Sequence, residues 1–214
     1  MSEKYVKIAA IIGIIACVGD FLFLFVFASY EPGYNHLKDT MSSLGASASP
    51  VSTEISVWWI IMGFLFIFFG IGFRFAFSRK NRYALIASFL IITYGMGEGI
   101  GSGVFKADRL AEGLSTSAII HDIVGGIGVV TILLLPLIML KVIPKNLISG
   151  FHKMSVIIFI IGIVTLMLFM FRFIPSANEF IATYKGLWQR LFVFNNYFYL
   201  ITIAVIILTH KNIP

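Results

Sequence analysis

The sequence has one cysteine and few charged residues. Cys17 lies inside an apolar run and has no partner thiol, which excludes an intrachain disulfide and the cysteine-rich zinc and iron–sulfur sites. Charged residues make up 12% of the 214 residues, whereas hydrophobic residues make up 59%, and the mean hydropathy is +0.97. Because a soluble domain is about one quarter charged, this composition predicts a polytopic membrane protein.

The motifs of common enzyme classes are also missing. No GxSxG surrounds Ser42 or Ser43, no HExxH is present, and the alternating glycines of residues 95–103 follow no strand, so they form no nucleotide-binding fingerprint. A haem held by two histidines would need a second histidine at membrane depth besides His121, and the sequence has none. We therefore predict no metal site, and the sequence leaves any cofactor unknown.

Six apolar runs are long enough to cross a bilayer. Each span needs about 20 mostly apolar residues, and backbone polar groups in hydrocarbon must pair within the chain, which favours helices. The first run is too long for a signal-peptide core, so we expect it to be retained. The predicted fold is all-α, a six-transmembrane-helix bundle in one integral membrane domain (residues 1–214), with spans at about 8–29, 55–77, 83–105, 117–140, 154–173 and 191–209.

The distribution of Lys and Arg predicts the orientation of the bundle. An even number of spans puts both termini on one side of the membrane, and ten of the 16 Lys and Arg residues fall on that side, Arg79 and Lys211 among them. The positive-inside rule assigns this side to the cytoplasm. We therefore expect a multi-pass protein of the cell membrane with cytoplasmic termini. The net charge of +6 then reflects topology and not nucleic-acid binding.

Five glycines alternate in the third predicted span. Gly95, Gly99 and Gly103 recur every four residues and give the helix one smooth face for close packing. Gly97 and Gly101 thin the opposite side. This pattern predicts a helix near the centre of the bundle.

The ionisable residues inside the spans share one depth. Asp20, Glu98, His121 and Asp122 all fall in the outer halves of their predicted helices, and Arg172 ends the fifth span on the same side. A charge at a helix centre costs about 2.5–3.5 kcal/mol on insertion scales, so each group needs a partner, water or a proton. We predict a polar cavity that opens to the outer side. The alternative is that each group only forms hydrogen bonds between helices.

Four short motifs lie at the outer ends of the predicted spans: DTMSSLG, GSGVFKAD, a histidine at the start of the fourth span, and GLWQR. Together they resemble the family called domain of unknown function 998, six-span membrane proteins of bacteria and archaea. Ser43 departs from the family pattern where an acidic residue is usual, as does Lys106 where proline is usual. The six-span plan is also similar, at the level of fold, to the eukaryotic Frag/DRAM/Sfk group, which is associated with lipid remodelling. The matching positions are Ser42, Leu44, Gly45, Gly103, Phe105, Asp108, His121, Gly186, Gln189 and Arg190.

Three functions are compatible with these observations. In the first, the outer cavity binds or processes the headgroup of a lipid or amphiphile: His121 acts as general acid or base, Asp108 orients it, and Arg190 grips an anionic head. Further predicted binding residues are Gln189, Ser42, Glu98, Asp122 and Asp20.

The other two functions need no lipid chemistry. A non-catalytic scaffold or regulator would use the polar groups only to fix helix packing. A small proton-coupled transporter would titrate Asp20, Glu98 and Asp122, although no inverted repeat supports it. The expected partners are membrane lipids or a small amphiphile, and the sequence decides neither enzymatic activity nor oligomeric state.

Overall fold

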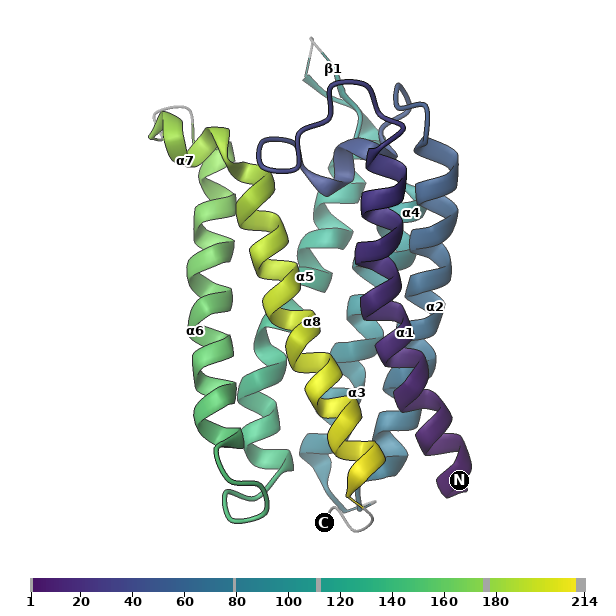
Figure 1. Ribbon diagram of the computed structural model, residues 1–214, viewed down its shortest axis with the longest axis vertical. Coiled ribbons are helices and arrows are strands. Elements are labelled where there is room, and N and C mark those ends of the chain that lie inside the picture. The colour runs from purple at the N-terminus through teal and green to yellow at the C-terminus, as the bar shows by residue number, and fades with distance from the viewer. Residues whose placement is uncertain (1, 79, 111–112, 175–177, 211–214) are drawn as a thin grey trace.

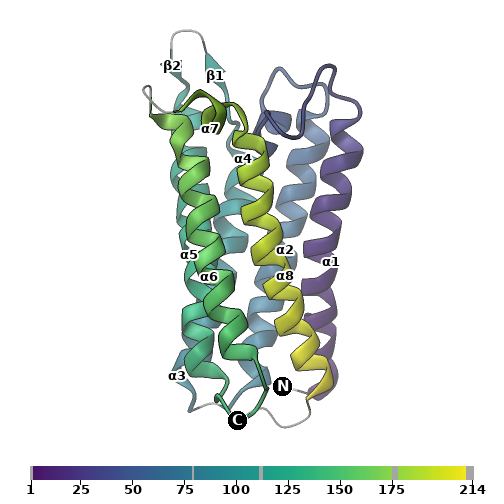
Figure 2. The same cartoon turned by 60° about the vertical axis from the view of Figure 1, so that its left-hand side comes forward.

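The computed structural model describes residues 2–78, 80–110, 113–174 and 178–210. Six long apolar helices run side by side along its longest axis (Figures 1 and 2). This confirms the predicted all-α, six-span bundle and a multi-pass membrane protein. The largest differences from the predicted ends are at the starts of the first and last helices, which begin several residues earlier. The spans are Glu3–Ala28 (α1), Ser52–Ala76 (α2), Arg82–Val104, Thr116–Val142 (α5), Phe151–Phe173 and Lys185–Thr209 (α8).

The third and fifth spans are composite. The third consists of α3 (Arg82–Tyr94), a π-helical segment η2 (Gly95–Gly101) and α4 (Ser102–Val104). The fifth consists of α6 (Phe151–Met170) and the 3₁₀ turn η3 (Phe171–Phe173). The short elements outside the spans are the 3₁₀ helix η1 (Met41–Gly45), the helix α7 (Glu179–Thr183) and the hairpin strands β1 (Arg109–Leu110) and β2 (Gly113–Leu114).

The start of α1 and the end of α8 lie at the same end of the bundle (Figure 1). This agrees with an even number of spans. The cytoplasmic location of that end stays a prediction from the Lys and Arg distribution. Arg79 and Lys211, which contribute to that distribution, lie outside the described residues.

The glycine pattern of the third span packs as predicted. A Cβ added at Gly99 would lie 2.3 Å from the Cα of Gly63 on α2, and one added at Gly97 would lie 2.3 Å from the carbonyl oxygen of Val124 on α5. The segment is therefore in backbone contact with a helix on each side. No other residue type fits there without separating the helices.

The conformation of this segment differs from the expected regular α-helix. Residues 95–101 form a π-helix, in which each backbone N–H bonds five residues back and one extra residue enters the turn. Glycine is well suited to this distortion because it lacks a side chain and has the widest backbone freedom. The π-helix carries Glu98 at its centre, on the side of α5: a Cβ added at Gly125 would lie 3.2 Å from Oε1 of Glu98.

Candidate functional site

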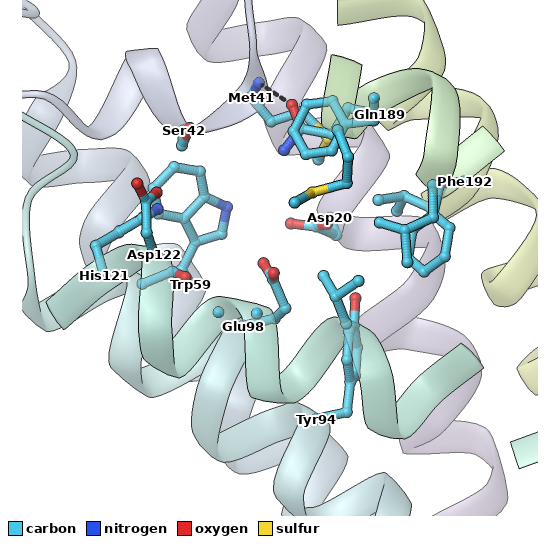
Figure 3. Close-up of a pocket in the computed structure, with 18 of the residues that line it drawn as sticks. Asp20, Met41, Ser42, Trp59, Tyr94, Glu98, His121, Asp122, Gln189 and Phe192 are labelled. Atoms are coloured by element: carbon cyan, nitrogen blue, oxygen red, sulfur yellow. Dashed lines mark hydrogen bonds between the residues drawn. The ribbon is translucent and has the colours of Figure 1, made fainter. Parts of the chain in front are cut away.

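A chamber of about 160 Å³ lies between the helices in the half of the bundle away from the start of α1 and the end of α8, which we call the outer half. Six of the eight predicted site residues line it: Asp20, Ser42, Glu98, His121, Asp122 and Gln189. Asp108 and Arg190 do not. Figure 3 shows side chains from α1, α2, α5, α8 and the third span converging on one space. The polar depth predicted from sequence therefore corresponds to a single cavity, which we call the chamber.

Asp20 is a buried acid of the chamber with hydrogen-bond partners. Its side chain is 2% exposed. The indole Nε1 of Trp58 donates to Oδ1 at 3.2 Å, and the hydroxyl of Tyr197 donates to Oδ2 at 2.9 Å. The hydroxyl of Tyr94 in turn donates to that of Tyr197 at 3.0 Å. These contacts fix the Asp20 carboxylate at the chamber wall and extend a hydrogen-bonded chain along it.

Glu98 also faces the chamber, but without such support. Within the described part of the chain, its carboxylate makes no hydrogen bond and no ion pair. Figure 3 shows this carboxylate turned toward that of Asp20 across the cavity. The charges of Asp20, Arg172 and Asp122 all act on it. Glu98 is thus an acceptor that the surrounding protein leaves available.

His121 and Asp122 are adjacent on α5 and point to different partners. His121 is 7% exposed, and its Nδ1 lies 2.9 Å from the carbonyl oxygen of Phe105. Because a carbonyl oxygen only accepts, Nδ1 carries the proton, and in the neutral ring Nε2 is left as an acceptor. Asp122 pairs with Nη2 of Arg109 at 2.9 and 3.1 Å. The chamber therefore holds one neutralised acid beside a histidine that can accept a proton.

Arg172 also lines the chamber. The sequence placed it only at the end of the fifth span and did not indicate it as a site residue. Its guanidinium carbon lies 3.8 Å from the ring centroid of Phe169 and 4.4 Å from that of Phe173. Its Nε is buried and has no hydrogen-bond partner among the described residues. An arginine inside the aromatic run FMFRF at the predicted cavity depth was the available signal, because a guanidinium stacks well on aromatic rings.

A second cavity of about 360 Å³ lies beside the chamber, and we call it the vestibule. The two share Ser42, Arg172 and Phe173 in their linings. Arg109, Arg172 and Lys185 line the vestibule against a single acid, Asp39. The vestibule is therefore basic where the chamber is mainly acidic, and Arg172 lies between them.

Asp108 fastens the first outer loop instead of orienting His121. Its Oδ1 accepts from the backbone N–H of Ser47 at 2.7 Å, and its Oδ2 accepts from the Ser47 hydroxyl at 2.8 Å. Asp108 and His121 form no hydrogen bond with each other in the described structure. The expected pair of orienting acid and catalytic histidine is therefore not formed. Instead, the carboxylate connects two loops.

Gln189 and Arg190 hold the same loop from α8. Oε1 of Gln189 accepts from the backbone N–H of Met41 at 2.8 Å. Nη1 of Arg190 donates to the carbonyl oxygens of Asp39 at 2.8 Å and of its own-helix residue Gly186 at 2.9 Å, and Nη2 donates to the hydroxyl of Tyr34. Contrary to expectation, Arg190 therefore does not lie in the chamber beside His121: both terminal nitrogens donate within the protein, and its buried Nε has no partner among the described residues.

Lys106, which follows the third span, also forms hydrogen bonds within the protein. Its ammonium donates to the carbonyl and hydroxyl of Ser52 and to the hydroxyl of Ser56, at 2.7–3.0 Å. Partial burial lowers the pKa of Lys106 from its ordinary value, while the charge of Asp108 opposes that effect. Lys106 thus ties the end of the third span to the start of α2.

The chamber reaches exposed residues of α5 and of the fifth span. These helices diverge from their short inner connection toward the outer end (Figure 1). Gly126, Met170 and Phe173 line the chamber and are also exposed on the outside of the bundle. A Cβ added at Gly126 would meet no atom within 4 Å. Since exposed surface at this depth would face hydrocarbon, we interpret this part of the wall as a side opening between the chamber and the bilayer.

The described residues contain no group of three or more His, Cys, Asp and Glu side chains arranged to hold a metal ion. What the arrangement supplies is a set of fixed charges, an imidazole acceptor and an aromatic wall. These are means of binding a polar group and of moving a proton.

The fold and the chamber together define a multi-pass, all-α membrane protein with a charged cavity in the outer half of its bundle. Residues 14–206 match the family described as protein of unknown function (DUF998), and the chain belongs to that family. No curated protein and no solved structure matches the chain. The wider similarity to the Frag/DRAM/Sfk group stays a prediction.

Proposed function

We propose that this protein binds an amphiphile, with the polar head in the chamber and the apolar tail passing between α5 and the fifth span into the bilayer. One observation carries the proposal: Gly126 and the apolar residues Met170 and Phe173 line a charged chamber and are also exposed, which we interpret as a side opening at membrane depth. A purely water-soluble ligand has no use for an apolar side opening. An amphiphile fits both parts at once.

The energetics of the cavity favour a charged or strongly polar head. An ionisable group inside a membrane bundle is expensive unless it is paired or hydrated. Glu98 and Nε of Arg172 lack hydrogen-bond partners within the part of the chain that the structure describes. A bound head that donates to the carboxylate and accepts from the guanidinium would remove both costs. Arg172 thereby takes the ligand-facing position expected of Arg190.

The proposal concerns binding and leaves His121 as the candidate for chemistry. Its Nε2 is an acceptor in a chamber that also holds the head, so a proton could be taken from a bound hydroxyl or ammonium. Asp108, bonded to Ser47, is not part of such a step.

The side opening can be tested by filling it. Gly126→Phe adds a ring at a position where an added Cβ meets no atom within 4 Å. Ile127→Phe is the matched control: residue 127 is 52% exposed and does not line the chamber. We expect native mass spectrometry of the purified protein to detect bound amphiphile in the wild type and in Ile127→Phe, and a strong loss of occupancy in Gly126→Phe.

Equal occupancy in the two variants would show that the tail does not use this opening. A wild-type protein that binds no amphiphile, either copurified or added as vesicle lipid extract, would refute the proposal altogether.

A further inference from the structure

We infer that the head is zwitterionic, with a primary ammonium held at Glu98 and Asp20 and a phosphate or other anion held at Arg172. This inference rests on the proposed function and names the chemistry of its ligand. Two observations support the inference: opposite charges lie apart in the chamber, and some of these charged groups have no partner within the described protein.

The acidic end of the chamber is suited to an ammonium. Figure 3 shows the carboxylates of Asp20 and Glu98 turned toward each other, near the aromatic side chains of Trp59 and Tyr94. Two carboxylates at close range repel each other, and one cation between them offsets the repulsion. The rings add a favourable quadrupole interaction with a cation.

The hydrogen bonding specifies a primary ammonium more closely. Asp20 already accepts from Trp58 and Tyr197, so its oxygens are partly saturated. Glu98 accepts from no donor among the residues described. An –NH₃⁺ group brings three donors and can satisfy Glu98 while it stays near the charge of Asp20. A quaternary ammonium would leave Glu98 without a hydrogen bond.

The basic end is suited to an anion. The guanidinium carbon of Arg172 lies 3.8 Å from the ring centroid of Phe169 and 4.4 Å from that of Phe173, and stacked rings leave the N–H edge of a guanidinium for binding. Such an edge grips phosphate or carboxylate through two parallel hydrogen bonds. Arg109 and Lys185 line the adjoining vestibule and make the potential there positive.

The opposite charges do not neutralise each other directly. Glu98 and Arg172 both line the chamber, and their charges interact, yet no ion pair within 4 Å joins them in the described structure. A neutral polar head would leave both charges uncompensated, and an anionic head would face the carboxylates. A zwitterion placed between them compensates both ends.

The order of the sites also agrees with a phosphoethanolamine-type head. Arg172 is next in sequence to Phe173, which is exposed at the side opening, whereas Glu98 lies on the central π-helix. A tail leaving through the opening therefore connects first to the anion near Arg172. The ammonium then lies farther inside. This is the order tail, phosphate, amine.

The test uses purified full-length protein in detergent and three probes: a short-chain phospholipid with an ethanolamine head, the same lipid with a glycerol head, and free phosphoethanolamine. Titration calorimetry gives Kd for each. Because a hydrogen bond to a charged group contributes about 1.5–3 kcal/mol, we expect the ethanolamine lipid to bind about ten- to a hundredfold more tightly than the glycerol lipid. Glu98→Gln should abolish this preference by weakening only the ethanolamine lipid. Glu54→Gln removes an exposed acid outside the chamber and should retain it.

The outcomes separate the two proposals. If both lipids bind equally to the wild type, the zwitterionic head is refuted and amphiphile binding stands. If free phosphoethanolamine binds as tightly as the lipid, the zwitterion stands and the amphiphile is refuted. If no lipid binds, the proposed function fails. If Glu98→Gln does not fold, Arg172→Gln decides instead: it should weaken both lipids and free phosphoethanolamine alike, and unchanged affinities would refute the assignment of the anion.

Discussion

The contact between Gly63 and Gly99 gives the most exacting test of the packing that positions Glu98. Gly99→Ala would put a Cβ 2.3 Å from the Cα of Gly63 and 2.7 Å from its nitrogen. Non-bonded carbon atoms are most stable about 3.5–4.0 Å apart. Both obstructing atoms are backbone, so no side-chain rotation relieves the clash, and α2 must move away from the π-helix by more than 1 Å.

The cost can be bounded. Overpacking a well-packed core costs about 1–3 kcal/mol, and alanine is favoured over glycine in a helix by about 1 kcal/mol. The clash is severe, so the net effect of Gly99→Ala should be a destabilisation of about 1–2 kcal/mol. Glu98, the preceding residue, shifts with the backbone, so amphiphile binding should weaken as well.

The control is Gly126→Ala, the same change at a helix position where a Cβ meets open space. It should be neutral or slightly stabilising, because the propensity gain remains and the clash is absent. Thermal unfolding in detergent, followed by tryptophan fluorescence, compares the two variants with the wild type. If Gly99→Ala unfolds at the same temperature as Gly126→Ala, the two backbones are not in contact and the reasoning is refuted.

Two further predictions concern the outer loops. Asp108→Asn weakens the two hydrogen bonds to Ser47. The docking of the first outer loop should lose about 1 kcal/mol, so proteolysis of that loop should be faster, while saturating amphiphile binding is retained. Lost binding with an unchanged rate of loop proteolysis would instead support a catalytic position for Asp108. Burial, and then the charge of Arg190, lower the pKa of His36 below its ordinary 6.5, so the folded state binds fewer protons than the unfolded state, and stability should fall as the pH drops through and below 6.5. His36→Gln should flatten that part of the melting-temperature profile, and a profile identical to that of the wild type would contradict the prediction.

The features that the sequence predicted well are those set by local physics. A span is a run of about 20 apolar residues, whichever neighbours it packs against. The four-residue repeat of Gly95, Gly99 and Gly103 defines a helix face without knowledge of the partner, and the structure supplies α2 as that partner. The shared depth of Asp20, Glu98 and His121 follows from counting residues along helices, and these three side chains do line one chamber.

The errors arose where partners come from distant segments. Asp108 and Arg190 have the depth of a site residue, but the first outer loop folds over the bundle. Ser47 and Asp39 of that loop form hydrogen bonds with the side chains of Asp108 and Arg190, respectively. No short-range pattern fixes the path of the 23-residue connection between α1 and α2, residues 29–51. The π-helix was missed for a related reason: a glycine-rich sequence permits it, and contacts on both sides select it.

The polar residues thus separate into two groups, and the separation bears on the scaffold alternative. In a protein whose polar groups serve only packing, buried polar atoms are paired, because an unpaired one costs about 1–3 kcal/mol. The loop group follows this rule in part: both oxygens of Asp108 and both terminal nitrogens of Arg190 are engaged, whereas Nε of Arg190 is buried without a partner in the described structure. The chamber group departs from it further, since the whole carboxylate of Glu98, as well as Nε of Arg172, lacks partners in the described structure. A scaffold has no reason to keep opposite charges apart around an empty space, whereas a binding protein needs them separated by the width of its ligand.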